Sequence, residues 1–143
     1  MTDSPATWVI AALEVITALG IAGFWIMWFR RPHDEPWLPD GYVDHEAPFV
    51  FTDTILAVVL VVAAILQVTE EPDSSAAMLV TGGRPVGESL GLIAAGMLLF
   101  LGVLDLAYFV RTGLFKREHE GIMNAGVVIA TLTLAVILIV RFV

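Results

Sequence analysis

The chain has 143 residues, of which 58% are apolar, and a formal net charge of −8 at pH 7. Its apolar share exceeds the roughly 45–50% of soluble domains, and its mean hydropathy is +0.86. The negative charge argues against nucleic acid as a partner and against a polybasic lipid anchor. The absence of cysteine excludes disulfides, thiolate zinc sites and iron–sulfur ligation.

Four apolar stretches divide the chain, at residues 7–29, 51–68, 87–110 and 122–140. Each approaches the ~20 residues that a helix needs to cross a bilayer core. A lipid-facing backbone must satisfy its own hydrogen bonds, so these stretches are expected to be helices rather than strands. We therefore predict an all-α integral membrane four-helix bundle embedded in the lipid bilayer. No remaining segment is long enough to bury a soluble core, so residues 1–143 are expected to form a single transmembrane domain.

The first predicted helix follows Pro5, with Thr7 as its expected N-cap, and ends before Pro32, which cannot continue it. Residues 30–50 then form a Pro-rich loop. Four prolines argue against a helix in this loop, while its apolar side chains predict that it folds back on the bundle or the headgroup zone. The four are Pro32, Pro36, Pro39 and Pro48.

The second helix is expected to be capped by Thr52 or Asp53. Residues 69–86 form an acidic outer loop, either a short hairpin or an interfacial turn. The third loop, 111–121, is short and charged, which makes the last two helices antiparallel neighbours.

Basic residues near the span ends set the expected orientation, because positive charge marks the cytoplasmic side. Loops one and three carry five such residues, and the other side of the membrane carries two. The N- and C-termini are therefore predicted outside, with loops 30–50 and 111–121 cytoplasmic. The five are Arg30, Arg31, Arg111, Lys116 and Arg117, and the two are Arg84 and Arg141.

Helical spacing places the rare polar residues on faces that also carry small residues, and such faces pack against other helices. We infer that the four faces meet. With a rise of about 1.5 Å per residue, the polar residues separate into two layers. The inner cluster is Asp53, Asp105, Tyr108 and Asn124, and the outer cluster is Glu14, Gln67 and Glu88.

An ionisable residue inside a span is costly, by about 2.5–3.5 kcal/mol at the centre, and is a functional candidate. Glu14 and Asp105 are the proton-binding candidates; in the alternative, each is protonated or hydrogen-bonded between helices. Glu88 suits the first turn of a helix electrostatically. Glu14 and Asp105 lie roughly 15 Å apart in depth, too far for a catalytic pair, and no catalytic residue is predicted.

The histidines point to no specific chemistry. His33 and His45 share the first loop with several acids, but their spacing matches no standard metal pattern. No metal site and no cofactor are therefore predicted. His119 is either a proton shuttle to Asp105 or a solvated loop histidine.

The stretch Leu13-Glu14-Val15-Ile16-Thr17 resembles the first helix of small multidrug resistance transporters. Those proteins are four-helix dimers whose first-helix glutamate binds protons and cationic drugs in turn. The resemblance covers one helix and implies that Glu14 carries the proton and the substrate. This chain differs in its longer first loop, its long acidic outer loop and its additional Asp105.

Several functions remain open, and none of the motifs demands an enzyme. The first hypothesis is a bundle that binds a small apolar or amphipathic ligand, such as a lipid or quinone, through Asp105, Tyr108, Asn124 and Asp53. The second is a proton-coupled small-molecule transporter that uses Glu14, as a homodimer. The third is a structural or accessory subunit whose acids only specify packing, and a membrane enzyme such as an isomerase is a fourth.

Overall fold

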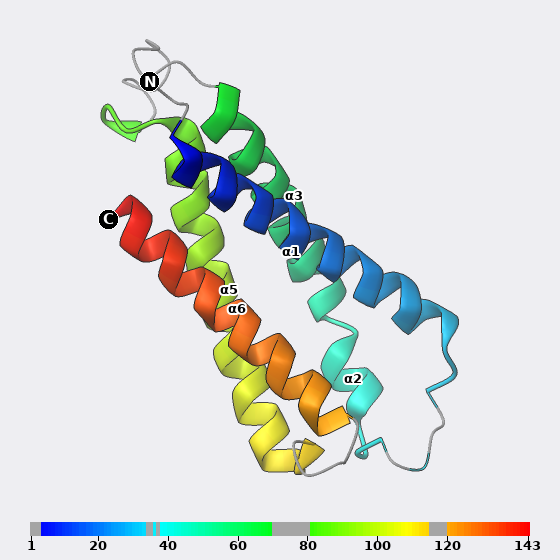
Figure 1. The fold of residues 1–143 in the computed structure, drawn as a ribbon. Helices are drawn as coiled ribbons and strands as arrows, with labels where there is room; N and C mark the ends of the chain where they lie inside the picture. Colours follow the sequence, from blue (N-terminus) through cyan, green and yellow to red (C-terminus); the bar gives the residue numbers. More distant parts are fainter. Residues whose placement is uncertain (1–3, 34–35, 37, 70–80, 115–119) are drawn as a thin grey trace. The chain divides into compact units, whose positions relative to one another are not determined.

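The structure is a computed structural model, and it describes residues 4–33, 36, 38–69, 81–114 and 120–143. In these segments the chain is all-α, with four long helices that are apolar enough to cross a membrane (Figure 1). The predicted all-α class with four membrane-length helices is confirmed, and the protein is a polytopic membrane protein. The long helices are α1 (Pro5–Arg30), α3 (Phe49–Thr69), α5 (Val86–Thr112) and α6 (Glu120–Phe142), and α2 (Tyr42–Glu46) is short.

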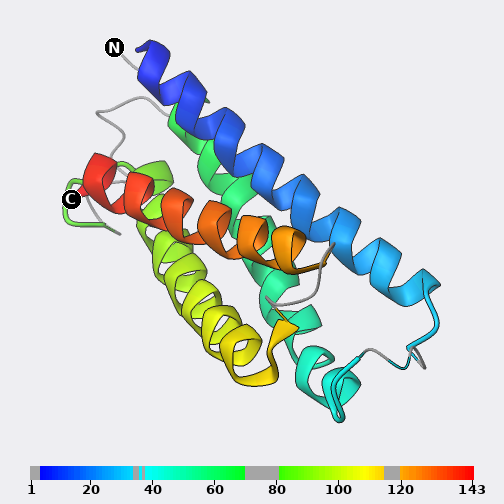
Figure 2. The ribbon, with the colours of Figure 1, turned by 60° about the horizontal axis from the view of Figure 1, so that its bottom comes forward.

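Residues 1–90 form one compact unit, in which α1 and α3 lie side by side and run in opposite directions (Figure 1 and Figure 2). The buried positions recur at helical spacing on the predicted packing faces, and the side chains between them are largely exposed. Small alanines on α3 let the two backbones approach each other closely. The buried face residues include Ile10, Glu14 and Trp25 of α1, and Leu60, Ala64 and Gln67 of α3.

Both predicted helix caps are wrong. Ser4 is the N-cap of α1, since its side chain accepts a hydrogen bond from the backbone N–H of Thr7, which lies in the first turn. α3 begins at Phe49, so Thr52 and Asp53 lie inside it. The reason is Pro48, whose missing N–H costs nothing at a helix start and whose fixed φ favours one.

The expectation of no helix in the loop of residues 30–50 is also wrong, because Tyr42–Glu46 form α2. The prolines flank this turn of helix instead of interrupting it. Gly41 begins it with a φ of 76°, a left-handed conformation that glycine adopts without steric cost. α2 contacts α3, the helix that follows it directly in the chain, and the folding of the loop back on the bundle stays a prediction.

Residues 91–143 form the second compact unit, made of the larger part of α5 together with α6. The two helices are antiparallel neighbours, as the short third loop predicts (Figure 2). They approach closely at Gly102, where an added Cβ would lie 2.8 Å from Leu132 Cδ2 and 3.3 Å from Thr131 Cγ2. The buried residues of this unit include Ala94, Leu98 and Leu101 on α5, and Val128, Ala135 and Leu138 on α6.

Gly102→Ala should give a lower melting temperature than Gly96→Ala, because the Leu132 side chain must shift to admit the new methyl group. Overpacking of this kind costs about 1–3 kcal/mol, against a gain of about 0.5–1 kcal/mol from replacing a helical glycine. Gly96→Ala is the matched control on the same helix, since a Cβ added there would meet nothing within 4 Å. Thermal unfolding in detergent should show Gly96→Ala at or above the wild type; equal stabilisation by both substitutions would contradict the close approach.

Candidate functional site

Glu14 is the most deeply buried ionisable residue in the described part of the chain. It lies in the apolar middle of α1, and its side chain is 0% exposed. No Lys, Arg or His side chain of the described residues pairs with it; its hydrogen-bond partner is the neutral amide of Gln67. Such a carboxyl group sits at the interface of α1 and α3 without a compensating positive charge.

The Gln67 amide holds this carboxyl group from α3. Gln67 Nε2 lies 3.1 Å from Glu14 Oε1 and 3.0 Å from Glu14 Oε2, so its N–H groups donate to both oxygens. The same nitrogen lies 3.5 Å from the backbone carbonyl oxygen of Gly87, at the start of α5. Gln67 thereby links α1, α3 and the first turn of α5, all within residues 1–90.

Gly87 permits this arrangement because its backbone packs directly on α3. A Cβ at Gly87 would lie 2.6 Å from the backbone nitrogen of Gln67 and 3.0 Å from the carbonyl carbon of Leu66. Both are main-chain atoms, which cannot move aside as a flexible side chain can. Any larger residue at position 87 would therefore separate the start of α5 from Gln67.

Two opposing influences act on the Glu14 carboxyl group. Burial in an apolar interface favours its neutral, protonated form, because an uncompensated charge is expensive there. The amide N–H groups favour the carboxylate, because they donate hydrogen bonds to both of its oxygens. The site is thus built to hold a proton while also stabilising the group after the proton has left.

Asp53 lies in a second polar contact between the same two helices. Trp25, which is 6% exposed, donates a hydrogen bond from Nε1 to Asp53 Oδ2 at 2.9 Å. The Trp25 ring packs edge-on against Trp28, with their centroids 5.3 Å apart, and Trp28 in turn packs on His33 at 4.1 Å. Trp28 Nε1 is buried and has no hydrogen-bond partner among the described residues.

The predicted outer cluster is brought together in part, since Glu14 meets Gln67. Glu88 lies in the first turn of α5, where its charge suits the helix dipole. Of the predicted inner cluster, Asp53 belongs to residues 1–90, where its partner is Trp25. The other three lie half-buried in the second unit: Asp105 and Tyr108 on α5, and Asn124 on α6.

Sequence reasoning missed two participants in these contacts, Trp25 and the Gly87 carbonyl. Helical spacing places Trp25 on the same face of α1 as Glu14, and both are buried there, so the sequence pattern contained the signal. A tryptophan with a buried ring needs an acceptor for its N–H, and an acid near the start of the following span is the natural choice. No sequence signal indicates which backbone carbonyl lies beside Gln67.

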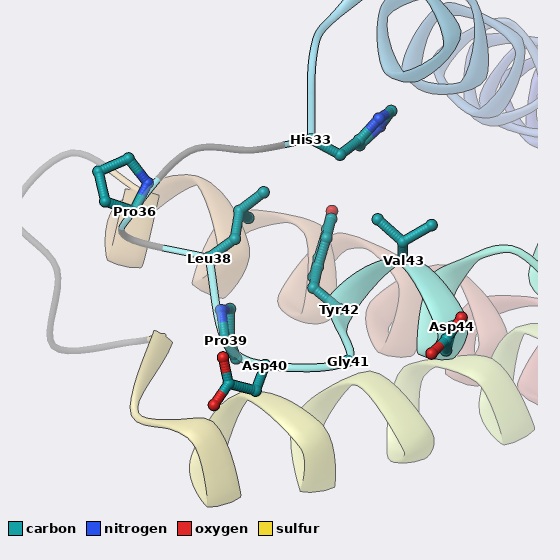
Figure 3. A pocket seen from close by; sticks show the side chains of 9 residues that line it. All are labelled: His33, Pro36, Leu38, Pro39, Asp40, Gly41, Tyr42, Val43 and Asp44. Carbon is teal, nitrogen blue, oxygen red and sulfur yellow. The ribbon is translucent and has the colours of Figure 1, made fainter.

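A shallow, open hollow lies in the connection between α1 and α3, with His33 across from α2 (Figure 3). Figure 3 shows the Leu38, Tyr42 and Val43 side chains projecting to one side of the hollow, whereas Asp40 and Asp44 point to the other. No group of three metal-ligating residues occurs in the described segments, and His119 lies outside them.

Comparison with known proteins gives no family for this chain: no protein-family model, curated protein or solved structure matches it.

Trp25→Phe should destabilise the fold by about 1–2 kcal/mol, because it removes the donor to Asp53 while keeping most of the ring. The measurement is a double-mutant cycle with Asp53→Leu, followed by thermal unfolding. The cost of Trp25→Phe should shrink clearly when Asp53 is already absent. Equal costs in both backgrounds would mean that the hydrogen bond contributes nothing.

Proposed function

We propose that this polytopic membrane protein binds and releases a proton at Glu14 and couples that exchange to the passage of a small molecule. The observation that carries the proposal is the completely buried Glu14 carboxyl group, whose partner is an amide and not a cation. A structural acid needs only one fixed protonation state. A proton carrier needs two states of similar free energy, which is what apolar burial opposed by the amide donors provides.

The resemblance of the Glu14 segment to small multidrug resistance transporters supports the same assignment. By that resemblance, a cationic amphipathic solute would exchange with the proton, and the working form would be a homodimer. The arginines beside the first and third loops support an orientation with both termini outside. In that orientation Glu14 lies nearer the outer surface, on the side from which an inwardly directed proton gradient would load it.

A second candidate function is binding of a small apolar or amphipathic ligand by Asp53, Asp105, Tyr108 and Asn124. The observation that favours it is the buried indole N–H of Trp28, which lacks a partner among the described residues and lies next to the Trp25–Asp53 contact. A ligand oxygen could accept from this donor and satisfy it. This candidate predicts a lipid or quinone that co-purifies with the wild type and is lost from Trp28→Phe.

Glu14→Gln should abolish proton exchange while preserving the fold, because glutamine has nearly the same shape and can pair with the Gln67 amide. Infrared difference spectra should show a protonated-carboxyl band that disappears as the pH rises in the wild type and is absent from Glu14→Gln. Addition of tetraphenylphosphonium, as a cationic amphipathic probe, should release protons from the wild type into a weakly buffered solution.

Glu88→Gln is the matched control, since it removes a half-buried glutamate one residue from Gly87. It should release protons as the wild type does. A Glu14→Gln protein that still releases protons would overturn the assignment. A wild-type carboxyl band that never changes while the protein stays folded would instead identify Glu14 as packing, as in an accessory subunit.

A further inference from the structure

The Gln67 side chain uses only one end of its amide. Nε2 faces both oxygens of Glu14 and the Gly87 carbonyl. Oε1 is buried and has no hydrogen-bond partner among the described residues, in a side chain that is only 7% exposed. An unsatisfied buried acceptor is energetically costly, so it is a feature that calls for a physical role.

The observed orientation suits the deprotonated form of Glu14. A carboxylate only accepts hydrogen bonds, so two oxygens facing one amide nitrogen is a favourable arrangement. A protonated carboxyl group also carries an O–H donor, which would then point at the N–H groups of Gln67. The acceptor that this O–H needs is Gln67 Oε1, which stands unused on the same side chain.

Rotation about the last torsion of Gln67 interchanges the two ends of the amide. This torsion joins an sp³ and an sp² carbon, so its preferences are broad and no large barrier opposes the turn. The turned amide accepts from the protonated Glu14 through Oε1. The Gly87 carbonyl then loses its contact with Nε2 and faces a second carbonyl oxygen, which repels it.

The start of α5 has little room to absorb this change. Gly87 already packs on the backbone of Gln67 and Leu66, where not even a methyl group fits. Relief of the repulsion therefore requires the first turn of α5 to shift relative to the end of α3. In this arrangement, loss or gain of one proton on α1 would shift the first turn of α5.

We propose that Gln67 is the positioning residue that transmits the proton occupancy of Glu14 to the start of α5, by turning its amide. This inference rests on the proposed proton exchange at Glu14 and adds the element that responds to it. In the deprotonated state Nε2 ties Glu14 to the Gly87 carbonyl. In the protonated state Oε1 accepts from Glu14, and the first turn of α5 is released.

The described helices of the first unit carry few other charged groups. α1 has no ionisable side chain besides Glu14 until Arg30, and α3 has only Asp53, which is held by Trp25 at the opposite end. Glu88 and Arg84 flank Gly87 at the start of α5. The charged residues of α2 are Asp44, His45 and Glu46, and Glu70, Glu71 and Asp73 lie outside the described residues.

The test uses the full chain, which has no cysteine of its own, with Ser89→Cys carrying a nitroxide spin label on the second turn of α5. Label mobility and the infrared carboxyl band of Glu14 are followed together as the pH is varied. In the wild-type background, both should change with the same midpoint. In Gln67→Met, the Glu14 band should still titrate while the change in label mobility is lost.

Gln67→Met leaves every titratable group of the protein in place. Any pH-dependent change in label mobility that does not require Gln67 would therefore persist in this variant. Gln67→Asn is the second variant, because its shorter amide retains polarity but cannot reach both Glu14 and Gly87; it should also lose the label response. Glu88→Gln should keep it. An unchanged response in both Gln67 variants, or a silent label in the wild type while Glu14 titrates, overturns the inference and leaves the proposed function standing. Failure of the Glu14 band itself to titrate overturns both.

Discussion

The buried hydrogen bond between Glu14 and Gln67 is the constraint on which the rest of the first unit depends. In a bilayer, helices gain nothing from hiding apolar surface from lipid, so packing and polar contacts must fix which faces meet. One carboxyl group and one amide, each costly when exposed to acyl chains, are satisfied together only when α1 and α3 adopt this register. The same contact brings the start of α5 against α3 through Gly87.

Asp53 and Trp25 provide a second polar contact between the same helices, closer to the connection that contains α2. Two separated contacts fix the rotation of α1 about its axis, because each requires a particular side chain to point at α3. The contacts differ in chemistry. The Trp25 indole can only donate a hydrogen bond, whereas the Gln67 amide can either donate to the Glu14 carboxyl group or accept from it.

Much of this fold follows from the sequence, for reasons that particular residues make clear. The lengths of the four apolar stretches predict the four helices. Helical spacing places Glu14 and Gln67 on packing faces at similar depths in the membrane. The start of α3 is harder to predict, because Pro48 counts as a barrier to a helix in the loop although it favours a helix start. The sequence pattern therefore predicts Asp53 as a helix cap, and this wrong prediction leaves no reason to expect its hydrogen bond with Trp25. The contact between Gln67 and the Gly87 carbonyl depends on how the backbone at the start of α5 crosses the end of α3. No residue type in the sequence predicts that crossing.

The tight crossing at Gly87 has an evolutionary consequence. The tightest contacts that demand a glycine there are with main-chain atoms, the backbone nitrogen of Gln67 and the carbonyl carbon of Leu66, so the demand persists whatever side chains stand at positions 14 and 67. Descendants of this chain that abandon proton exchange would be free to replace the acid and the amide as a pair with apolar side chains of equal bulk, yet would still be obliged to retain the glycine. If positions 14 and 67 vary together among such descendants while position 87 stays glycine, the pair is retained for proton exchange and the glycine for helix packing.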